Sequence, residues 1–185
     1  MDRLRDPLET PVMRTQTILT TRRLRLRTWR SSDARAYHKH CNTSDVMEHL
    51  GGVVTPRQLK REVEWFKRHQ EREGISFWVI ERKRDSEFLG FCGLIRVTEP
   101  SSTVFGEVEI GWRVRSDMWR RGYAHEAAAA VLRLGRGKVA ERIISRVAPG
   151  NRSSRGLMSK LGMRPLPDLD YVDSRDQMQL LVYGI

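Results

Sequence analysis

The strongest constraint on the fold is a change of hydrophobic period after residue 114. Over residues 104–114, apolar and charged side chains alternate, which is the pattern of a strand with one buried face. From about Gly122 onward, apolar residues recur at helical spacing, beginning with Ala124 and Ala127. A short basic loop joins the two patterns. The chain therefore predicts a strand that runs almost directly into the N-terminus of a helix.

Further strands and helices are predicted on both sides of this unit. Strands are expected from Thr17, at 75–81, at 88–97, at 142–147 and over the C-terminal MQLLVYGI, and helices from 33 to Gly51, from Thr55 to Gly74 and after Asn151. Thr55, Pro56 and Gln58 form the pattern of a capping box with proline at the first helical position. The order of elements predicts one mixed α/β (α+β) domain over residues 17–185, preceded by a mobile arm over residues 1–16.

Charge is the least balanced feature of the composition. The chain has 34 Lys+Arg against 23 Asp+Glu, a net charge of +11, and only six of the cations are lysine. Such a surface attracts nucleic acid, a polyphosphate cofactor or an anionic membrane, unless it is simply solvated. No apolar run reaches the ~18 residues that span a bilayer, and the two cysteines and five histidines form no metal pattern. We expect a cytoplasmic protein with no metal site and no membrane contact.

The loop between the strand and the helix is a candidate anion site. Arg113, Arg115, Arg120 and Arg121 flank Gly122, which has no Cβ and lets the backbone approach a ligand. The first N–H groups of a helix are unpaired and carry partial positive charge, so the loop suits a pyrophosphate. Neither a Walker motif nor a dinucleotide fingerprint is present. An ordinary basic loop is the alternative.

Three stretches, EVEIGWRV, MWRRGYAHEAA and APGNRSSRGLMSKLGM, resemble the GNAT superfamily of N-acetyltransferases. The resemblance is greatest to the branch that includes the bacterial ribosomal-protein alanine N-acetyltransferases, and it extends over roughly residues 17–165. It implies a GNAT-like single domain with a mixed, mostly antiparallel sheet that contains two splayed parallel strands and is flanked by helices. It also implies acetyl-CoA as co-substrate, no metal, and transfer of the acetyl group to a primary amine by direct attack in a ternary complex.

The resemblance assigns cofactor-binding roles to the loop and to the two splayed strands. Loop amides would bind the CoA pyrophosphate, and Arg120 stands where the family usually has glycine, so that it either crowds the phosphates or grips them. The backbone around Trp112 to Val114 would pair with pantetheine amides, and Asn151 would bind the CoA arm. The complete predicted set comprises Trp112, Arg113, Val114, Trp119, Arg120, Arg121, Gly122, Tyr123, Ala124, Asn151 and Ser154.

Acetyl transfer to an amine requires a base, because an amine is mostly protonated at neutral pH. Glu109 is our choice, since it lies inside the strand beside the expected splay, and Glu107 shares its face and is the competitor. A cross-strand salt bridge with an arginine is the alternative for each carboxylate. Ser154 would give its proton to the leaving thiolate. Cys41 and Cys92 are expected to pack in the core.

Two other functions stay open on the sequence. A catalytically silent CoA-binding regulatory module is favoured by Arg120 and by Gly135 and Gly137, which interrupt the helix and predict its early end. A basic RNA- or ribosome-binding protein is favoured by eight arginines in the first thirty residues, although no RNA-binding motif accompanies them. The acceptor, a protein N-terminal amine or a small amine, and the oligomeric state, a homodimer among the options, are not determined.

Overall fold

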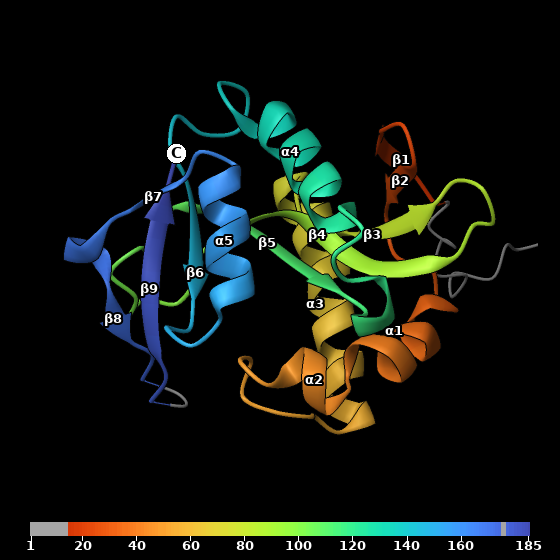
Figure 1. The fold of residues 1–185 in the computed structure, drawn as a ribbon, viewed down its shortest axis with the longest axis horizontal. Helices are drawn as coiled ribbons and strands as arrows, with labels where there is room; N and C mark the ends of the chain where they lie inside the picture. The colour runs from red at the N-terminus through yellow and green to blue at the C-terminus, as the bar shows by residue number, and fades with distance from the viewer. Residues whose placement is uncertain (1–14, 175–176) are drawn as a thin grey trace, which may run out of the picture.

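The structure is a computed structural model that describes residues 15–174 and 177–185 (Figure 1). Its strands are β1 (Thr17–Thr20), β2 (Leu24–Arg27), β3 (Phe77–Arg82), β4 (Phe88–Arg96), β5 (Val108–Val114), β6 (Ile143–Val147), β7 (Arg164–Pro165), β8 (Tyr171–Val172) and β9 (Gln179–Gly184). Its helices are α1 (Asp33–Cys41), α2 (Ser44–Met47), α3 (Pro56–Glu73), α4 (Tyr123–Gly135) and α5 (Arg152–Lys160), with 3-10 turns at Ser116–Met118 and Pro167–Leu169. The expected N-terminal arm lies outside the described residues except for Thr15 and Gln16.

The strands form one sheet in the order β1-β2-β3-β4-β5-β6-β9-β7, and β8 pairs with β9 outside this path. Every neighbouring pair is antiparallel except β5 and β6, which run parallel and pair only at Val108↔Ile143 and Glu109↔Ile144. Beyond these positions β5 pairs only with β4, and β6 pairs only with β9. The expectation of a mostly antiparallel sheet with two splayed parallel strands is confirmed.

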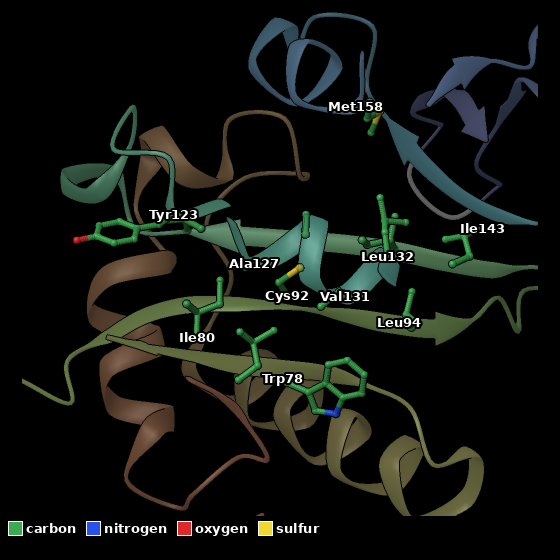
Figure 2. Close-up of a cluster of buried hydrophobic side chains, with 14 of the residues drawn as sticks. Trp78, Ile80, Cys92, Leu94, Tyr123, Ala127, Val131, Leu132, Ile143 and Met158 are labelled. Carbon is green, nitrogen blue, oxygen red and sulfur yellow. The ribbon is translucent and has the colours of Figure 1, made fainter. Parts of the chain in front are cut away.

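Helices cover both faces of the sheet and bury the core. On one face, Ala127 and Val131 of α4 are fully buried and belong to one cluster with Leu94 and Ile80 of the sheet (Figure 2). On the other face, α1 and α3 bury a second cluster that includes Phe66 and residues of β3 and β4. Burial of this apolar surface is the main favourable term in folding. None of the described helices is both long and apolar enough to cross a membrane.

Local caps fix the ends of two helices as the sequence predicts. The Thr55 hydroxyl accepts a hydrogen bond from Gln58 N at 3.3 Å, and the Gln58 side chain accepts one from Thr55 N at 2.9 Å. Helix α3 ends at Gly74, which has a φ of 71°. Helix α5 begins after Asn151, whose Oδ1 accepts from Ser154 N at 3.0 Å. These bonds satisfy backbone groups that a helix end leaves without a partner.

The region over residues 17–51, for which the sequence predicts one strand and one helix, contains two strands and two helices. The strand from Thr17 is a hairpin of β1 and β2, because the Thr21 hydroxyl accepts from Leu24 N at 3.0 Å and turns the chain. The helix expected from 33 to Gly51 breaks into α1 and α2. At the break, Asn42 bonds both backbone groups of Val54, at 2.8 and 2.9 Å. The Ser32 side chain, at the N-cap of α1, makes no capping hydrogen bond.

The strand expected over residues 104–114 begins only at Val108. Residues before it form turns, in which Phe105 N donates to Ser102 O and Gly106 has a φ of 82°. Helix α4 ends early, as expected, at Gly135. A Cβ on Gly135 would lie 2.6 Å from Leu94 Cδ1, so the glycine also allows close packing on the sheet.

His69 connects α3 to β4 inside the protein. Its Nε2 accepts a hydrogen bond from Arg96 N at 3.1 Å, its ring stacks on Trp65, and its exposed fraction is 1%. Burial and the positive charge of Arg72 lower the pKa of His69 below its usual value of 6.5. The folded protein therefore disfavours protonated His69.

We expect stability to fall as the pH drops below about 6.5, because the unfolded chain then binds a proton that folded His69 resists. His69→Gln removes this titration, so its free energy of unfolding should depend less on pH between about 7 and 5. Urea unfolding of both proteins across this range measures the difference. Carboxylates contribute equally to both, so identical pH slopes would contradict the prediction.

Candidate functional site

The gap between β5 and β6 exposes two facing strand edges. After Glu109 and Ile144 the two strands no longer pair with each other, and Gly111, Trp112 and Arg113 are half-buried. The backbone N–H and C=O groups on these edges require partners. An extended ligand with amide groups can supply them by the same hydrogen bonds that a strand makes. Helices α4 and α5 follow β5 and β6 in the chain, so their N-termini lie beyond this gap.

The loop that leads into α4 has an unusual backbone. Trp119 Nε1 donates to Val114 O at 2.6 Å, and 46% of the Trp119 surface is exposed. That bond occupies one carbonyl of the stretch expected to pair with pantetheine. Arg120 has a φ of 57°, a left-handed conformation that costs a non-glycine residue about 1–2 kcal/mol. This explains why glycine is usual there in the family that the sequence resembles.

Gly122 places the N-terminus of α4 where an anion can approach. It is the N-cap with a φ of 78°, and its carbonyl accepts from Glu126 N at 3.0 Å. The N–H groups of the first turn, from Tyr123 on, have no acceptor within the helix. Arg120 and Arg121 are exposed beside them. Backbone donors, helix dipole and two cations together suit a diphosphate.

Arg23, which the sequence placed only in the N-terminal arginine cluster that favours RNA binding, contacts this loop from the β1–β2 turn. Its Nε lies 2.6 Å from Glu126 Oε2, and its Nη1 donates to Arg121 O at 3.0 Å. Its guanidinium lies 4.4 Å from the centre of the Tyr123 ring. A Cβ on Gly122 would lie 3.3 Å from its Nη2. Arg23 therefore holds the loop and the first turn of α4 in place.

The side chain of Arg113 points away from the candidate anion site. It donates to the Tyr37 hydroxyl and lies 3.3 Å from Glu62 Oε1 of α3. Tyr37 and Trp29 are buried core residues. The expectation that the Arg113 charge flanks a pyrophosphate is therefore wrong, although the predicted role of its backbone is not affected.

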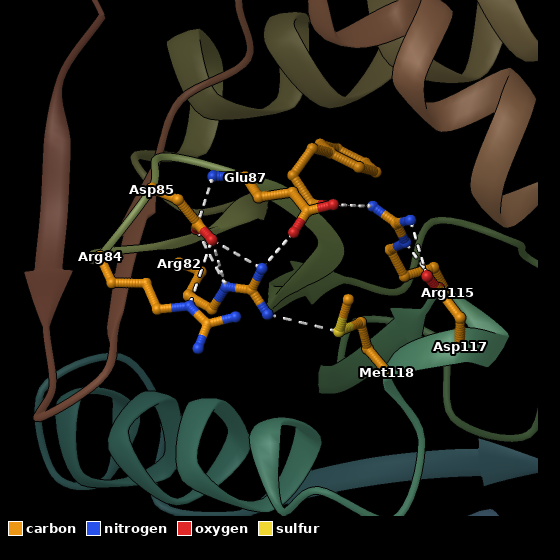
Figure 3. A network of polar contacts seen from close by, with 8 residues as sticks. Arg82, Arg84, Asp85, Glu87, Arg115, Asp117 and Met118 are labelled. Atoms are coloured by element: carbon orange, nitrogen blue, oxygen red, sulfur yellow. Dashed lines mark hydrogen bonds and ion pairs between the residues drawn. The ribbon is translucent and has the colours of Figure 1, made fainter.

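Arg115 is likewise bound to carboxylates rather than free for phosphate (Figure 3). It lies 2.6 Å from Asp117 and 2.8 Å from Glu87, and Glu87 also pairs with Arg82. Hydrogen bonds from Arg82 hold the pKa of Asp85 well below its usual range. Of the four arginines expected at the site, only Arg120 and Arg121 keep exposed side chains.

Three of the N-terminal arginines, Arg25, Arg27 and Arg30, are paired with one buried carboxylate within the protein. Glu81 is fully buried and accepts from Arg25 at 2.7 Å, from Arg27 at 2.7 Å and from Arg30 at 3.1 Å. Arg27 also makes two bonds to Asp33, at 2.7 and 2.9 Å. Burial opposes ionisation of Glu81, but the bonds from Arg27 outweigh it and lower its pKa. These arginines stabilise the fold and are not spare charges for a polyanion.

Both candidate bases form ion pairs with arginines of the neighbouring strand region. Glu107 pairs with Arg142, and Glu109 Oε2 lies 2.6 Å from Arg146 Nη2. The alternative considered for each carboxylate, a salt bridge, is thus what the structure contains. The side chain of Glu109 is the more buried, at 10% exposed against 25%. Glu109 stands at the last paired position beside the gap, whereas Glu107 precedes the strand.

Asn151 and Ser154 lie at the start of α5, on the other side of the gap. Asn151 Oδ1 caps the helix by accepting a hydrogen bond from Ser154 N at 3.0 Å. The segment between α2 and α3 reaches the same turn, because a Cβ on Gly150 would lie 3.3 Å from His49 Cε1. That segment carries the exposed Leu50. The only sequence signal for this segment is the Gly51-Gly52 pair, which predicts the end of a helix and no contact with Gly150.

Among residues 15–174 and 177–185, no group of three or more His, Cys, Asp and Glu side chains could hold a metal ion. The groups beside the gap are backbone amides, arginines, carboxylates and hydroxyls. The arrangement can bind an anionic, amide-containing ligand between two strands and can accept a proton at a nearby carboxylate.

Comparisons with known proteins agree on one family. A family model described as Acetyltransferase (GNAT) domain matches residues 23–164. The uncharacterized protein YkkB of Bacillus subtilis is 36% identical over 156 residues, which cover 82% of this chain and 87% of the relative. An acetyltransferase structure from Agrobacterium tumefaciens has a TM-score of 0.77 at 25% identity, covering 90% of this chain and 92% of that one. A spermidine N-acetyltransferase from Vibrio cholerae, in complex with CoA and spermine, shares the fold with a TM-score of 0.65 at 16% identity, covering 89% and 96%.

Replacement of Arg23 tests whether it holds the loop that precedes α4. Arg23→Met should lower the free energy of unfolding by about 1–3 kcal/mol, because it leaves Glu126 without its charged partner. Arg22→Met is the matched control, since Arg22 is exposed. Thermal unfolding of both variants measures the effect. Equal losses in the two variants would contradict a specific role for Arg23.

Proposed function

Because the chain belongs to the GNAT acetyltransferase family, we propose that it is an acetyl-CoA-dependent N-acetyltransferase that acts on a primary amine. The observation that carries the proposal is the coincidence of two features. The parallel strands β5 and β6 part after two paired positions, and α4 begins next to them behind a basic loop. The unpaired strand edges suit the amides of pantetheine, and the basic loop with the N-terminus of α4 suits a pyrophosphate.

The residues beside the gap fit both the pyrophosphate of CoA and the pantetheine arm that carries the acetyl group. The αL glycine Gly122 leaves the first-turn amides of α4 accessible, and Arg120 and Arg121 add charge beside them. We assign the pyrophosphate to these groups, and the pantetheine arm to the unpaired edge of β5 and to the Asn151 amide. Acetyl-CoA supplies a thioester, whose acyl carbon is open to attack by an amine.

We assign to Glu109 the removal of the proton that the amine must lose, directly or through one water. A backbone N–H on the unpaired edge of β5 would stabilise the charge that develops on the acyl oxygen. Ser154, in the first turn of α5, would give its proton to the leaving thiolate. We assign each of these three roles because the group lies beside the gap between β5 and β6.

Direct transfer without an acyl-enzyme fits the state of the cysteines. Cys41 and Cys92 are both fully buried in the core. Burial raises the pKa of Cys41 to about 12 and raises that of Cys92 as well. A thiol with a raised pKa forms little of the nucleophilic thiolate at neutral pH. Neither cysteine is therefore suited to carry the acetyl group.

We place the amine acceptor on the side of the gap where the segment between α2 and α3 approaches Gly150. Leu50 and Val53 of that segment are 42% and 59% exposed, so apolar surface is available there to a substrate. The spermidine N-acetyltransferase that shares this fold holds CoA and spermine together. We propose a protein N-terminal amine or a small-molecule amine as the acceptor class.

The first test is CoA binding followed by turnover. CoA at about 100-fold above its Kd should stabilise the protein by about 2.7 kcal/mol and raise its Tm. Thiol release from acetyl-CoA should then require a free amine, supplied as polyamines, amino-acid amides or short peptides. The same peptides with acetylated N-termini and no lysine are the control.

Other outcomes assign other functions. If CoA does not change the Tm, the acetyltransferase proposal fails at its first step. Binding of CoA without thiol release for any amine in the panel would indicate a catalytically silent module. RNA binding with a steep dependence on salt, in the absence of any CoA effect, would indicate the nucleic-acid alternative.

Two matched glutamate variants test the base. Glu109→Gln should lower kcat/KM by about 10²–10⁴-fold, since a positioned base contributes that much. The CoA affinity should not change. Glu107→Gln is the control, because Glu107 also pairs with an arginine but lies before the strand. Steady-state rates with the best amine measure both. A larger loss in Glu107→Gln would move the role of base to Glu107.

A further inference from the structure

In the ion pair between Glu109 and Arg146, the arginine contacts only one of the two carboxylate oxygens. Arg146 donates from Nη2 and from Nε to the same carboxylate oxygen, Oε2, at 2.6 and 3.1 Å. Within the part of the chain that the structure describes, Glu109 Oε1 takes part in no hydrogen bond or ion pair with a side chain or backbone group. One oxygen of the carboxylate is fixed, and the other is free for a further proton donor.

The third nitrogen of the Arg146 guanidinium, Nη1, also has partners. Its Nη1 donates to the Tyr171 hydroxyl at 2.8 Å and lies 3.6 Å from Glu99 Oε2. The side chain of Arg146 is 12% exposed. Tyr171 belongs to β8 and Glu99 to the connection between β4 and β5, so two further segments fix the guanidinium. A guanidinium with partners on both sides has few alternative rotamers.

The ion pair crosses the gap where the backbone pairing ends. Glu109 occupies the last paired position of β5, opposite Ile144, and Arg146 lies two residues further along β6. Residues two apart in a strand share a face, so Arg146 extends from the Ile144 side of β6 to Glu109. The side chains thus connect β5 to β6 at the place where the main chains stop doing so.

We propose that Arg146 is a positioning residue that fixes Oε2 of Glu109 and leaves Oε1 to accept the proton of the acceptor amine. The inference rests on the proposed function, in which Glu109 is the base. In the step, the amine nitrogen bonds to the acyl carbon and its proton passes to Oε1, directly or through water. The bond from acyl carbon to sulfur breaks, and the thiolate takes a proton from Ser154 or from solvent.

Three variants distinguish the effect of the Arg146 charge from the effect of its two-donor contact with Glu109. Arg146→Met removes both the positive charge and the two-donor contact, whereas Arg146→Lys keeps the charge and loses the contact. Tyr171→Phe keeps the ion pair and loses the phenol that holds the guanidinium. Arg142→Met is the matched control, because Arg142 forms the corresponding pair with Glu107 away from the gap.

In activity assays, Arg146→Met should lower kcat by about 10²-fold, as a misplaced reacting group does. The acidic limb of its pH profile should move to higher pH, because a positive charge beside the carboxylate is gone. Arg146→Lys should lower kcat with the acidic limb nearly unchanged, and Tyr171→Phe should lower kcat less. CoA affinity should stay at the wild-type value in all three. Arg142→Met should match the wild-type protein in every readout.

A second readout needs no turnover. The carboxyl signal of Glu109 in the protein alone can be observed by carbon-13 NMR and assigned from its loss in Glu109→Gln. Its chemical shift at neutral pH should change in Arg146→Met, because both donors to Oε2 are gone. If Arg146→Met does not fold, the lysine and Tyr171→Phe variants still test the geometry.

Wild-type kcat in folded Arg146→Lys and Tyr171→Phe would overturn the positioning role, as would an unchanged Glu109 carboxyl signal in Arg146→Met. These results differ from failure of the proposed function. Full activity in Glu109→Gln would remove the base assignment itself, whatever the arginine variants do. No CoA binding by the wild-type protein would remove the acetyltransferase proposal.

Discussion

The candidate site depends on how little of the parallel pair β5–β6 is hydrogen-bonded. Only two register positions pair, after which each strand has a single neighbour. An unpaired edge inside a sheet leaves N–H and C=O groups that need partners, and this need creates affinity for an amide-containing ligand. Helices α4 and α5 follow the two parting strands, so their N-termini serve the same opening. Glu109 stands at the point of parting, and its side chain pairs with Arg146 of β6.

The arginine excess has a different meaning in the structure than in the composition. A net charge of +11 suggested a polyanionic partner. Arg25, Arg27 and Arg30 instead neutralise a buried glutamate, and Arg23 holds the loop that precedes α4. A buried carboxylate is stable only when cations or donors surround it, so these arginines are part of the fold. Arg120 and Arg121, in the loop that precedes α4, keep exposed side chains.

Local sequence signals predicted the caps of α3 and α5. The predictions that failed concern features that depend on contacts between residues far apart in the sequence. The capping box of α3 and the asparagine cap of α5 involve residues three positions apart, so both are visible in a short window of sequence. The break after α1 depends on Asn42 bonding Val54, which lies 12 positions away. The two-residue strands β7 and β8 are too short to carry any period.

By itself, the sequence determined most of the longer elements, the caps of α3 and α5, and the loop that suits a pyrophosphate, because periods, caps and motifs are properties of neighbouring residues. The mixed sheet with one parallel pair was implied by the family resemblance that the motifs carry. Only the tertiary structure decided which side chain meets which. Arg146 lies on Glu109 from 37 positions away, Arg23 lies on Glu126 from 103, and Arg113 turns its charge toward α1 and α3. Such pairs follow from strand order, register and the face each residue occupies, and none of these is encoded in local pattern.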